Sequence, residues 1–123
     1  IGLSHYPMTN SQMTWKAMNS AAILNIKTLA SKYGCKVMVC EVGVKASASE
    51  IATSTQCLTD FMNSVKSLSV CAGVFYWEPQ VDGKWRPAIY EKQGRNWGAY
   101  DMGAFTSDGS AITPTSILSA FGE

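Results

Sequence analysis

Hydrophobic and polar positions follow two kinds of pattern along this chain. Three short runs, at residues 1–6, 35–41 and 72–77, are mostly apolar. Two longer stretches between them, 11–33 and 49–68, repeat apolar residues every three or four positions. Short apolar runs rich in Val and aromatic residues are typical of strands in a parallel sheet, and the longer period is typical of amphipathic helices. The pattern therefore predicts the order β-α-β-α-β.

The predicted helices have recognisable ends. Gly34 is expected to stop the first helix, and Ser49 is a candidate N-cap for the second. The apolar positions expected to face the core are Trp15, Met18, Ala22, Ile26 and Leu29 in the first helix and Ile51, Leu58, Phe61, Val65 and Leu68 in the second. Helix-length connections between successive strands require parallel strands joined by right-handed crossovers, so the sequence predicts an α/β fold.

The rest of the chain has a different character. Residues 80–112 carry several aromatic side chains among Gly, Asp and Asn, without a helical period. Loops of this length are usually functional. Asp108-Gly109 predicts a hairpin turn, and Thr113-Pro114 predicts the start of a short closing helix that runs to Phe121.

Composition narrows the classes of function. The 123 residues suffice for one domain, and 46% are hydrophobic against 15% charged. With a formal net charge of +1 and scattered Lys and Arg, the chain shows no signature of nucleic-acid or anionic-membrane binding. No apolar stretch is long enough to cross a bilayer, and the start shows no signal-peptide pattern. Because the chain begins inside a predicted strand, we expect it to be the C-terminal piece of a longer protein.

The four cysteines do not have the spacing of a metal site. Cys35, Cys40, Cys57 and Cys71 form no Cys-x-x-Cys pair and have no nearby histidine, so a zinc site is not expected. Unpaired cysteine is commonly a small buried residue, and we expect that role for these four. A Cys35–Cys71 bridge between neighbouring strand starts is the one pairing that merits a test.

Two of the apolar runs end in a glutamate, Glu41 after 37–40 and Glu78 after 74–77. Parallel α/β enzymes place their chemistry at the C-terminal ends of the strands, where the substrate crevice opens. Tyr6 ends the first predicted strand and is expected to stand beside Glu41, where its hydroxyl would orient the carboxylate by a hydrogen bond. On sequence position alone, a surface glutamate and a core tyrosine remain alternatives.

Four segments, 1–7, 32–43, 73–79 and 97–109, together resemble the C-terminal part of glycoside hydrolase family 53, the endo-β-1,4-galactanases (arabinogalactan endo-β-1,4-galactosidases). The motif Trp77-Glu78-Pro79 is their most recognisable part. The resemblance implies that residues 1–123 are the last three βα units, strands six to eight, of a (β/α)8 TIM barrel. The expected shape is an open partial barrel with a long loop and a hairpin after the last strand, and strands one to five would be missing.

The sequence departs from the family pattern at several points. His5 stands where Tyr or Phe is commoner, and the loop after Glu41 lacks the acidic run of the calcium site found in some members. The acid/base glutamate of the family ends the fourth strand, so the resemblance places it outside this chain. The piece alone is therefore expected to be inactive.

The resemblance also implies the chemistry and the roles of the site residues. Retaining hydrolysis of internal β-1,4-galactosidic bonds would use Glu41 as the nucleophile and Tyr6 to orient it. The expected substrate-binding residues, with Trp77 as the stacking platform, are Trp77, His5, Glu78, Trp85 and Trp97. No cofactor or metal is implied. The resemblance points to a secreted, periplasmic or cell-surface enzyme acting on β-galactan.

Two other functions remain open at this stage. One is a glycosidase that acts on another β-linked polysaccharide. The other is a non-catalytic carbohydrate-binding module, which the aromatic residues of 80–112 suggest but the β-α-β-α-β order disfavours. If the chain is part of a glycosidase of either kind, its three parallel strands would have open edges, which predicts self-association of the isolated chain.

Overall fold

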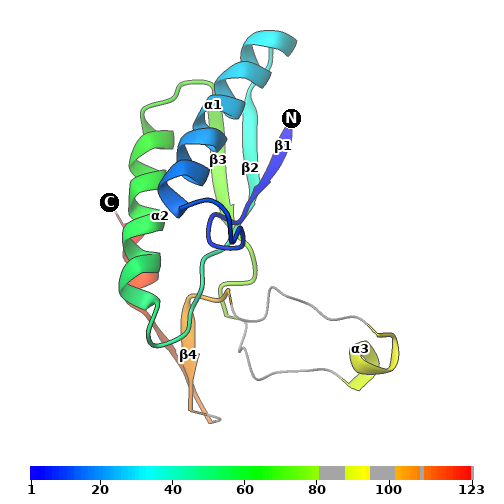
Figure 1. Cartoon of the computed structure of the whole chain (residues 1–123), viewed down its shortest axis with the longest axis vertical. Helices are drawn as coiled ribbons and strands as arrows, with labels where there is room; N and C mark the ends of the chain where they lie inside the picture. The colour runs from blue at the N-terminus through cyan, green and yellow to red at the C-terminus, as the bar shows by residue number, and fades with distance from the viewer. Residues whose placement is uncertain (81–87, 95–101, 109, 123) are drawn as a thin grey trace.

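The computed structural model describes residues 1–80, 88–94, 102–108 and 110–122. Strands β1 (Gly2–His5), β2 (Val37–Val42) and β3 (Cys71–Tyr76) form a parallel sheet in the order β1-β2-β3. Helices α1 (Trp15–Tyr33) and α2 (Ile51–Lys66) pack beside each other on one face of this sheet (Figure 1). The predicted β-α-β-α-β order and the parallel pairing are confirmed.

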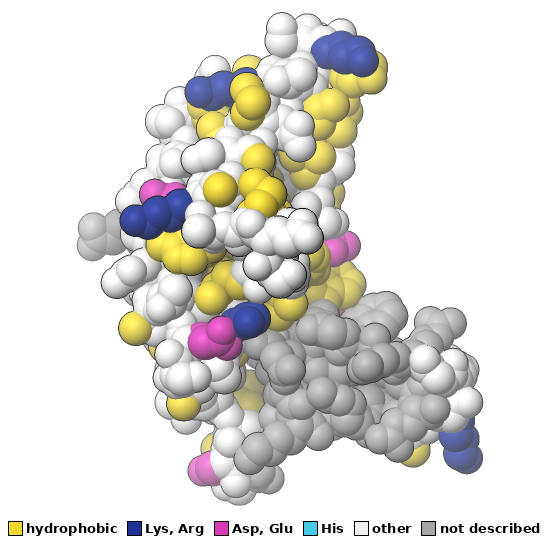
Figure 2. Space-filling view, viewed as in Figure 1, with side chains coloured by type: hydrophobic (Ala, Val, Ile, Leu, Met, Phe, Trp, Pro, Cys, Tyr) yellow, Lys and Arg dark blue, Asp and Glu magenta, His cyan; other side chains and the backbone are white. Residues whose placement is uncertain are grey.

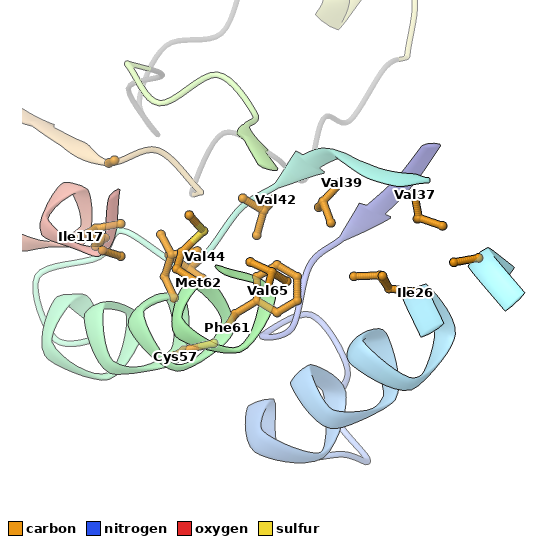
Figure 3. Packing of buried hydrophobic residues seen from close by; sticks show 14 residues of the cluster. Ile26, Val37, Val39, Val42, Val44, Cys57, Phe61, Met62, Val65 and Ile117 are labelled. Atoms are coloured by element: carbon orange, nitrogen blue, oxygen red, sulfur yellow. The ribbon is translucent and has the colours of Figure 1, made fainter. Parts of the chain in front are cut away.

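The core lies between the sheet and these two helices. Val37, Val39 and Val42 of β2 point toward the helices, and Ile26 of α1 and Phe61 of α2 point back toward the sheet (Figure 3). Each of these side chains is almost fully buried. Burying a side chain of this size contributes about 1.5–3 kcal/mol, so this layer is the main source of stability in the described fold.

The two ends of α1 have clear local causes. The helix begins at Trp15 rather than at the predicted Ser11, because the hydroxyl of Thr14 caps it by accepting a hydrogen bond from the backbone N–H of Ala17 at 3.2 Å. Gly34 ends the helix as predicted, with φ at 61°, a left-handed conformation that glycine adopts without strain.

The N-cap predicted for α2 is wrong. Glu50, not Ser49, occupies the cap position, and it makes no side-chain cap hydrogen bond. The hydroxyl of Ser47 donates to the Glu50 carboxylate at 2.8 Å, and the Glu50 N–H donates to the Ser47 carbonyl at 2.8 Å. These two residues close a turn directly before the helix, so Ser49 is left outside the cap.

The C-terminal region contains the predicted hairpin. Strands β4 (Phe105–Ser107) and β5 (Ile112–Pro114) pair antiparallel (Figure 1). At the turn, a carboxylate oxygen of Asp108 accepts hydrogen bonds from the backbone N–H groups of Ser110 and Ala111. This contact explains why an Asp at the start of the connection favours the turn.

The predicted start of the closing helix is wrong. Thr113 and Pro114 lie in β5, and the 3-10 helix η2 (Ser116–Phe121) begins after them. The hydroxyl of Thr115 accepts from the Ile117 N–H at 3.3 Å and so serves as the cap. A short helix, α3 (Ala88–Lys92), also lies in the stretch for which the sequence predicted no helix.

Strand β2 contains one more residue than its neighbours near its C-terminal end. Leu3 pairs with Val39, but the next residue of β1, Ser4, pairs with Glu41. The pairing of β2 with β3 shows the same irregularity between 39 and 42. A bulge of this kind breaks the strict alternation of faces. Consequently Val42, and not Glu41, is the next helix-facing residue after Val39.

The face of the sheet away from α1 and α2 is partly open. Phe75 is 59% exposed, and Cys40 is exposed as well.

The four cysteines differ in burial. Cys35 and Cys40 are exposed, Cys57 is buried and Cys71 is intermediate, so the expectation of four buried cysteines is wrong for two of them. All four are free thiols, and the Cys35–Cys71 bridge is not formed.

Charged side chains are scattered over the face that Figure 2 shows rather than gathered into one patch. The helices in the described part of the chain are each too short or too polar to cross a bilayer.

Candidate active site

The C-terminal ends of β1 and β2 bring a phenol and a carboxylate together. Tyr6 follows directly after β1, and Glu41 is the second-last residue of β2. The Tyr6 hydroxyl donates a hydrogen bond to Glu41 Oε2 at 2.9 Å. The two residues are 35 positions apart in the sequence, so the contact depends on the parallel pairing of the two strands. The predicted contact between Tyr6 and Glu41 is confirmed.

The surroundings of Tyr6 keep its phenol protonated. Burial, the hydrogen bond to Glu41 and the negative charges of Glu41 and Glu78 all raise the pKa of Tyr6 well above its usual range, with burial the largest cause. A protonated phenol donates one hydrogen bond, and here the acceptor is Glu41 Oε2. Glu78, after the third strand, contributes less to this rise than Glu41 does.

A second tyrosine, Tyr76, connects two backbone segments near this site by hydrogen bonds. Its hydroxyl lies 2.8 Å from the Met102 carbonyl and 3.1 Å from the Gly103 carbonyl, to which it donates, and it accepts from the Val44 N–H at 3.4 Å. Burial raises the pKa of Tyr76 to about 12, against the opposing effect of the Val44 N–H. Tyr76 therefore joins the segment after Glu41 to residues 102–103. Tyr76 lies within the apolar run 74–77, and that pattern gives no signal for this role.

Trp77 and Glu78 follow β3 at the same edge of the sheet. The Trp77 N–H donates to the Val42 carbonyl at 2.9 Å, which fixes the start of this segment beside β2, and the Trp77 side chain is partly buried. Glu78 is exposed and has φ at 45°, a left-handed conformation that non-glycine residues rarely adopt. Such local strain is common at functional sites.

His5 lies on the other side of the sheet. It is 6% exposed, its Nε2 is 2.9 Å from Asn19 Oδ1, and its ring centroid is 4.5 Å from that of Phe61. Asn19 Nδ2 donates to the Cys57 carbonyl and to Asp60 Oδ2, so Asn19 Oδ1 faces the histidine. The structure thus places His5 among the helices and not beside Tyr6 and Glu41. This position corrects the expectation that His5 lines the sugar site.

The remaining expected residues, Trp85 and Trp97, lie outside the described residues. Within the ranges that the structure describes, no three side chains of His, Cys, Asp or Glu gather closely enough to hold a metal ion.

Together these features define an α/β protein with a carboxylate and its phenol donor at the C-terminal ends of parallel strands. The family model of glycosyl hydrolase family 53 matches residues 1–118, so the chain belongs to this family. Family 53 is a family of TIM-barrel glycosidases, and the membership supports glycosidase activity in general. A search of curated proteins found no match to the chain.

Proposed function

We propose that this chain supplies the nucleophile and part of the sugar-binding wall of a retaining endo-β-1,4-galactanase. The observation that carries the proposal is the Tyr6–Glu41 hydrogen bond at the strand ends of a family 53 chain. In this proposal β1, β2 and β3 correspond to strands six, seven and eight of the barrel. The parallel order β1-β2-β3, within a chain that the family model covers over residues 1–118, supports this correspondence.

The proposed reaction has two steps. Glu41 attacks the anomeric carbon of the galactosyl unit, the glycosidic bond breaks, and a covalent galactosyl-enzyme forms. Water then hydrolyses this intermediate and releases Glu41. The Tyr6 hydroxyl stabilises the ionised carboxylate and fixes the direction of its attacking oxygen.

A retaining mechanism needs a second carboxyl group about 5–5.5 Å from the nucleophile, to protonate the leaving oxygen. We assign this acid/base role to a glutamate outside the 123 residues, at the end of the fourth barrel strand. Glu78 is placed in the binding wall, where its exposed carboxylate is able to accept hydrogen bonds from sugar hydroxyls.

Trp77 is proposed as the platform for a galactosyl ring. An indole offers a broad apolar surface to the C–H face of a sugar, together with one N–H donor. The Trp77 side chain is only partly buried, as a platform requires. We propose Trp85 and Trp97 as more distant sugar contacts, on their sequence alone.

The first test replaces Glu41 by Gln in an active protein that contains this sequence. The swap is nearly isosteric, so binding of galacto-oligosaccharides should remain while turnover of galactan falls by several orders of magnitude. Glu50→Gln is the matched control, because Glu50 lies at the start of α2 and pairs with Lys45. Its turnover should stay within about twofold of the wild type. A Glu41→Gln protein that keeps more than about a tenth of the turnover would contradict the proposal.

Substrate class is tested separately with purified polysaccharides. The proposal expects the highest kcat/KM on β-1,4-galactan, with β-1,4-mannan and β-1,4-glucan at least tenfold poorer, roughly the discrimination that a few specific contacts provide. Equal or better hydrolysis of mannan or glucan would keep the glycosidase and reject galactan as its substrate.

A further inference from the structure

The ring of Tyr6 rests directly on Gly43, the second residue after Glu41. Gly43 is buried, and a Cβ atom built on it would lie 2.8 Å from Tyr6 Cε1 and 3.1 Å from Tyr6 Cδ1. Carbon atoms in ordinary contact are about 3.5–4.0 Å apart, so even a methyl group would collide with the ring. Gly43 does not need its conformational freedom here, because its φ is not in the left-handed region. The close approach of the ring is what requires glycine.

The backbone around Gly43 has little room to retreat. The Gly43 N–H donates to the His5 carbonyl of β1 at 3.3 Å, and on the other side the Trp77 N–H holds the Val42 carbonyl at 2.9 Å. The same built Cβ would also lie 3.4 Å from Met102 Cβ. The segment is therefore fixed by β1, by β3 and by the chain at 102, so the Tyr6 ring is the part that would have to move.

We propose that Gly43 is a positioning residue for Glu41 and acts through the Tyr6 ring. An added side chain at position 43 would displace the ring, and the hydroxyl at the end of the ring would leave Glu41 Oε2. The present distance between these oxygens is 2.9 Å. A displacement of about 0.7 Å, the least that restores normal carbon contact, is enough to break an O–H···O hydrogen bond of this kind.

The catalytic meaning of this role rests on the proposed function, but the contact can be measured without turnover. In the chain labelled with 13C at tyrosine Cζ, the Tyr6 signal is assigned by its loss in Tyr6→Phe. Replacing Glu41 by Gln should shift the Tyr6 signal, because the phenol then loses its carboxylate acceptor. In the Gly43→Ala background the same Glu41→Gln change should shift the signal by less than about a quarter as much, because the hydrogen bond is already broken.

Gly2 offers a matched control. A Cβ built on Gly2 would lie 2.7 Å from Cys40 Sγ, so Gly2→Ala creates similar crowding in the same sheet without touching Tyr6. The Gly2→Ala background should retain the full shift caused by Glu41→Gln. A full shift in the Gly43→Ala background as well would overturn the proposal.

A second variant decides the case in which Gly43→Ala does not fold. If the collision is with the Tyr6 ring, the double variant Tyr6→Ala/Gly43→Ala removes it and should recover cooperative thermal unfolding. A double variant that stays unfolded while Tyr6→Ala alone folds would show that the ring is not what position 43 must accommodate. In an active protein, Gly43→Ala should lower kcat about tenfold or more with little change in KM, whereas Gly2→Ala should leave both near the wild-type values. If Glu41→Gln keeps its activity while the spectroscopic result holds, the proposed function fails and the positioning of Glu41 by Gly43 remains.

Discussion

At the scale of single residues, His5 shows how burial fixes a protonation state. The Asn19 amide nitrogen donates hydrogen bonds to the Cys57 carbonyl and to Asp60 Oδ2, so the amide oxygen is the atom that faces His5. Because that oxygen can only accept, His5 must carry a proton on Nε2. Burial lowers the pKa of His5 below its usual value of 6.5, against the opposing effect of the Asn19 hydrogen bond. The neutral ring, with its proton on Nε2, is therefore the form that the fold favours.

This lowered pKa predicts a loss of stability in mild acid. The unfolded chain takes up a proton near pH 6.5, and the folded chain does so only at lower pH. The contribution of His5 to the free energy of unfolding is therefore greatest above pH 6.5. It declines as the pH falls below that value toward the folded-state pKa of His5. Urea unfolding at several pH values between about 7 and 5.5, above the range where carboxylates usually titrate, measures the decline.

His5 is the single histidine of the sequence, which makes the assignment direct. His5→Gln keeps a donor for Asn19 but does not titrate, so its unfolding free energy should be nearly flat over the same pH range. An equal slope in His5→Gln would show that another group causes the decline.

At the scale of elements, Asn19 ties α1 to both β1 and α2. It is 2% exposed and makes three hydrogen bonds, to His5, to the Cys57 carbonyl and to Asp60. A polar side chain in the middle of a buried helix face is stable only with such partners. This network holds the end of β1, from which Tyr6 continues, against the helical layer.

We predict that Asn19→Ala destabilises the fold by roughly 1–3 kcal/mol, the usual cost of leaving buried polar partners unsatisfied. Asn25→Ala provides the control, because Asn25 lies on the same helix and is exposed. Its effect should stay within about 0.5 kcal/mol. Urea unfolding followed by circular dichroism measures both, and equal effects would contradict a structural role for the Asn19 network.

The elements were predictable from sequence to different degrees. Hydrophobic periodicity located both long helices and all three parallel strands, because burial on one face sets that period. The Tyr6–Glu41 contact followed from the parallel order, since it places both strand ends at one edge. The N-terminal ends of α2 and η2 were predicted wrongly. Ser47 and Thr115 fix them by local hydrogen bonds, which the apolar pattern does not reveal. The role of Gly43 depends on a ring that approaches from another strand, which no local pattern reveals.

At the scale of the whole molecule, the sheet has two strand edges that remain unpaired within the described residues, one on β1 and one on β3. The face away from the helices also exposes Phe75. In a closed barrel, neighbouring strands pair with both edges and interior side chains cover that face. Unpaired edges beside exposed apolar side chains favour association with other chains.

We therefore expect the isolated chain to self-associate. Light scattering over a concentration series should show an apparent mass that rises above that of the 13.3 kDa monomer. Phe75→Ser should weaken the association, whereas Leu24→Ser should not, because Leu24 is 65% exposed but lies on α1 rather than on the sheet. A chain that stays monomeric throughout, or equal effects of the two substitutions, would contradict association through this face.

The extra residue of β2 determines which changes of length this sheet can absorb. If Cys40 were deleted, Ser4 would still pair with Glu41, and Val42 would still follow Val39 toward the helices. Strand β1 carries no such surplus residue, so a deletion between Gly2 and His5 would exchange the two faces of the strand. A deletion at position 40 during divergence would therefore keep Glu41 beside Tyr6. A deletion within β1 would instead turn His5 outward and Tyr6 into the core.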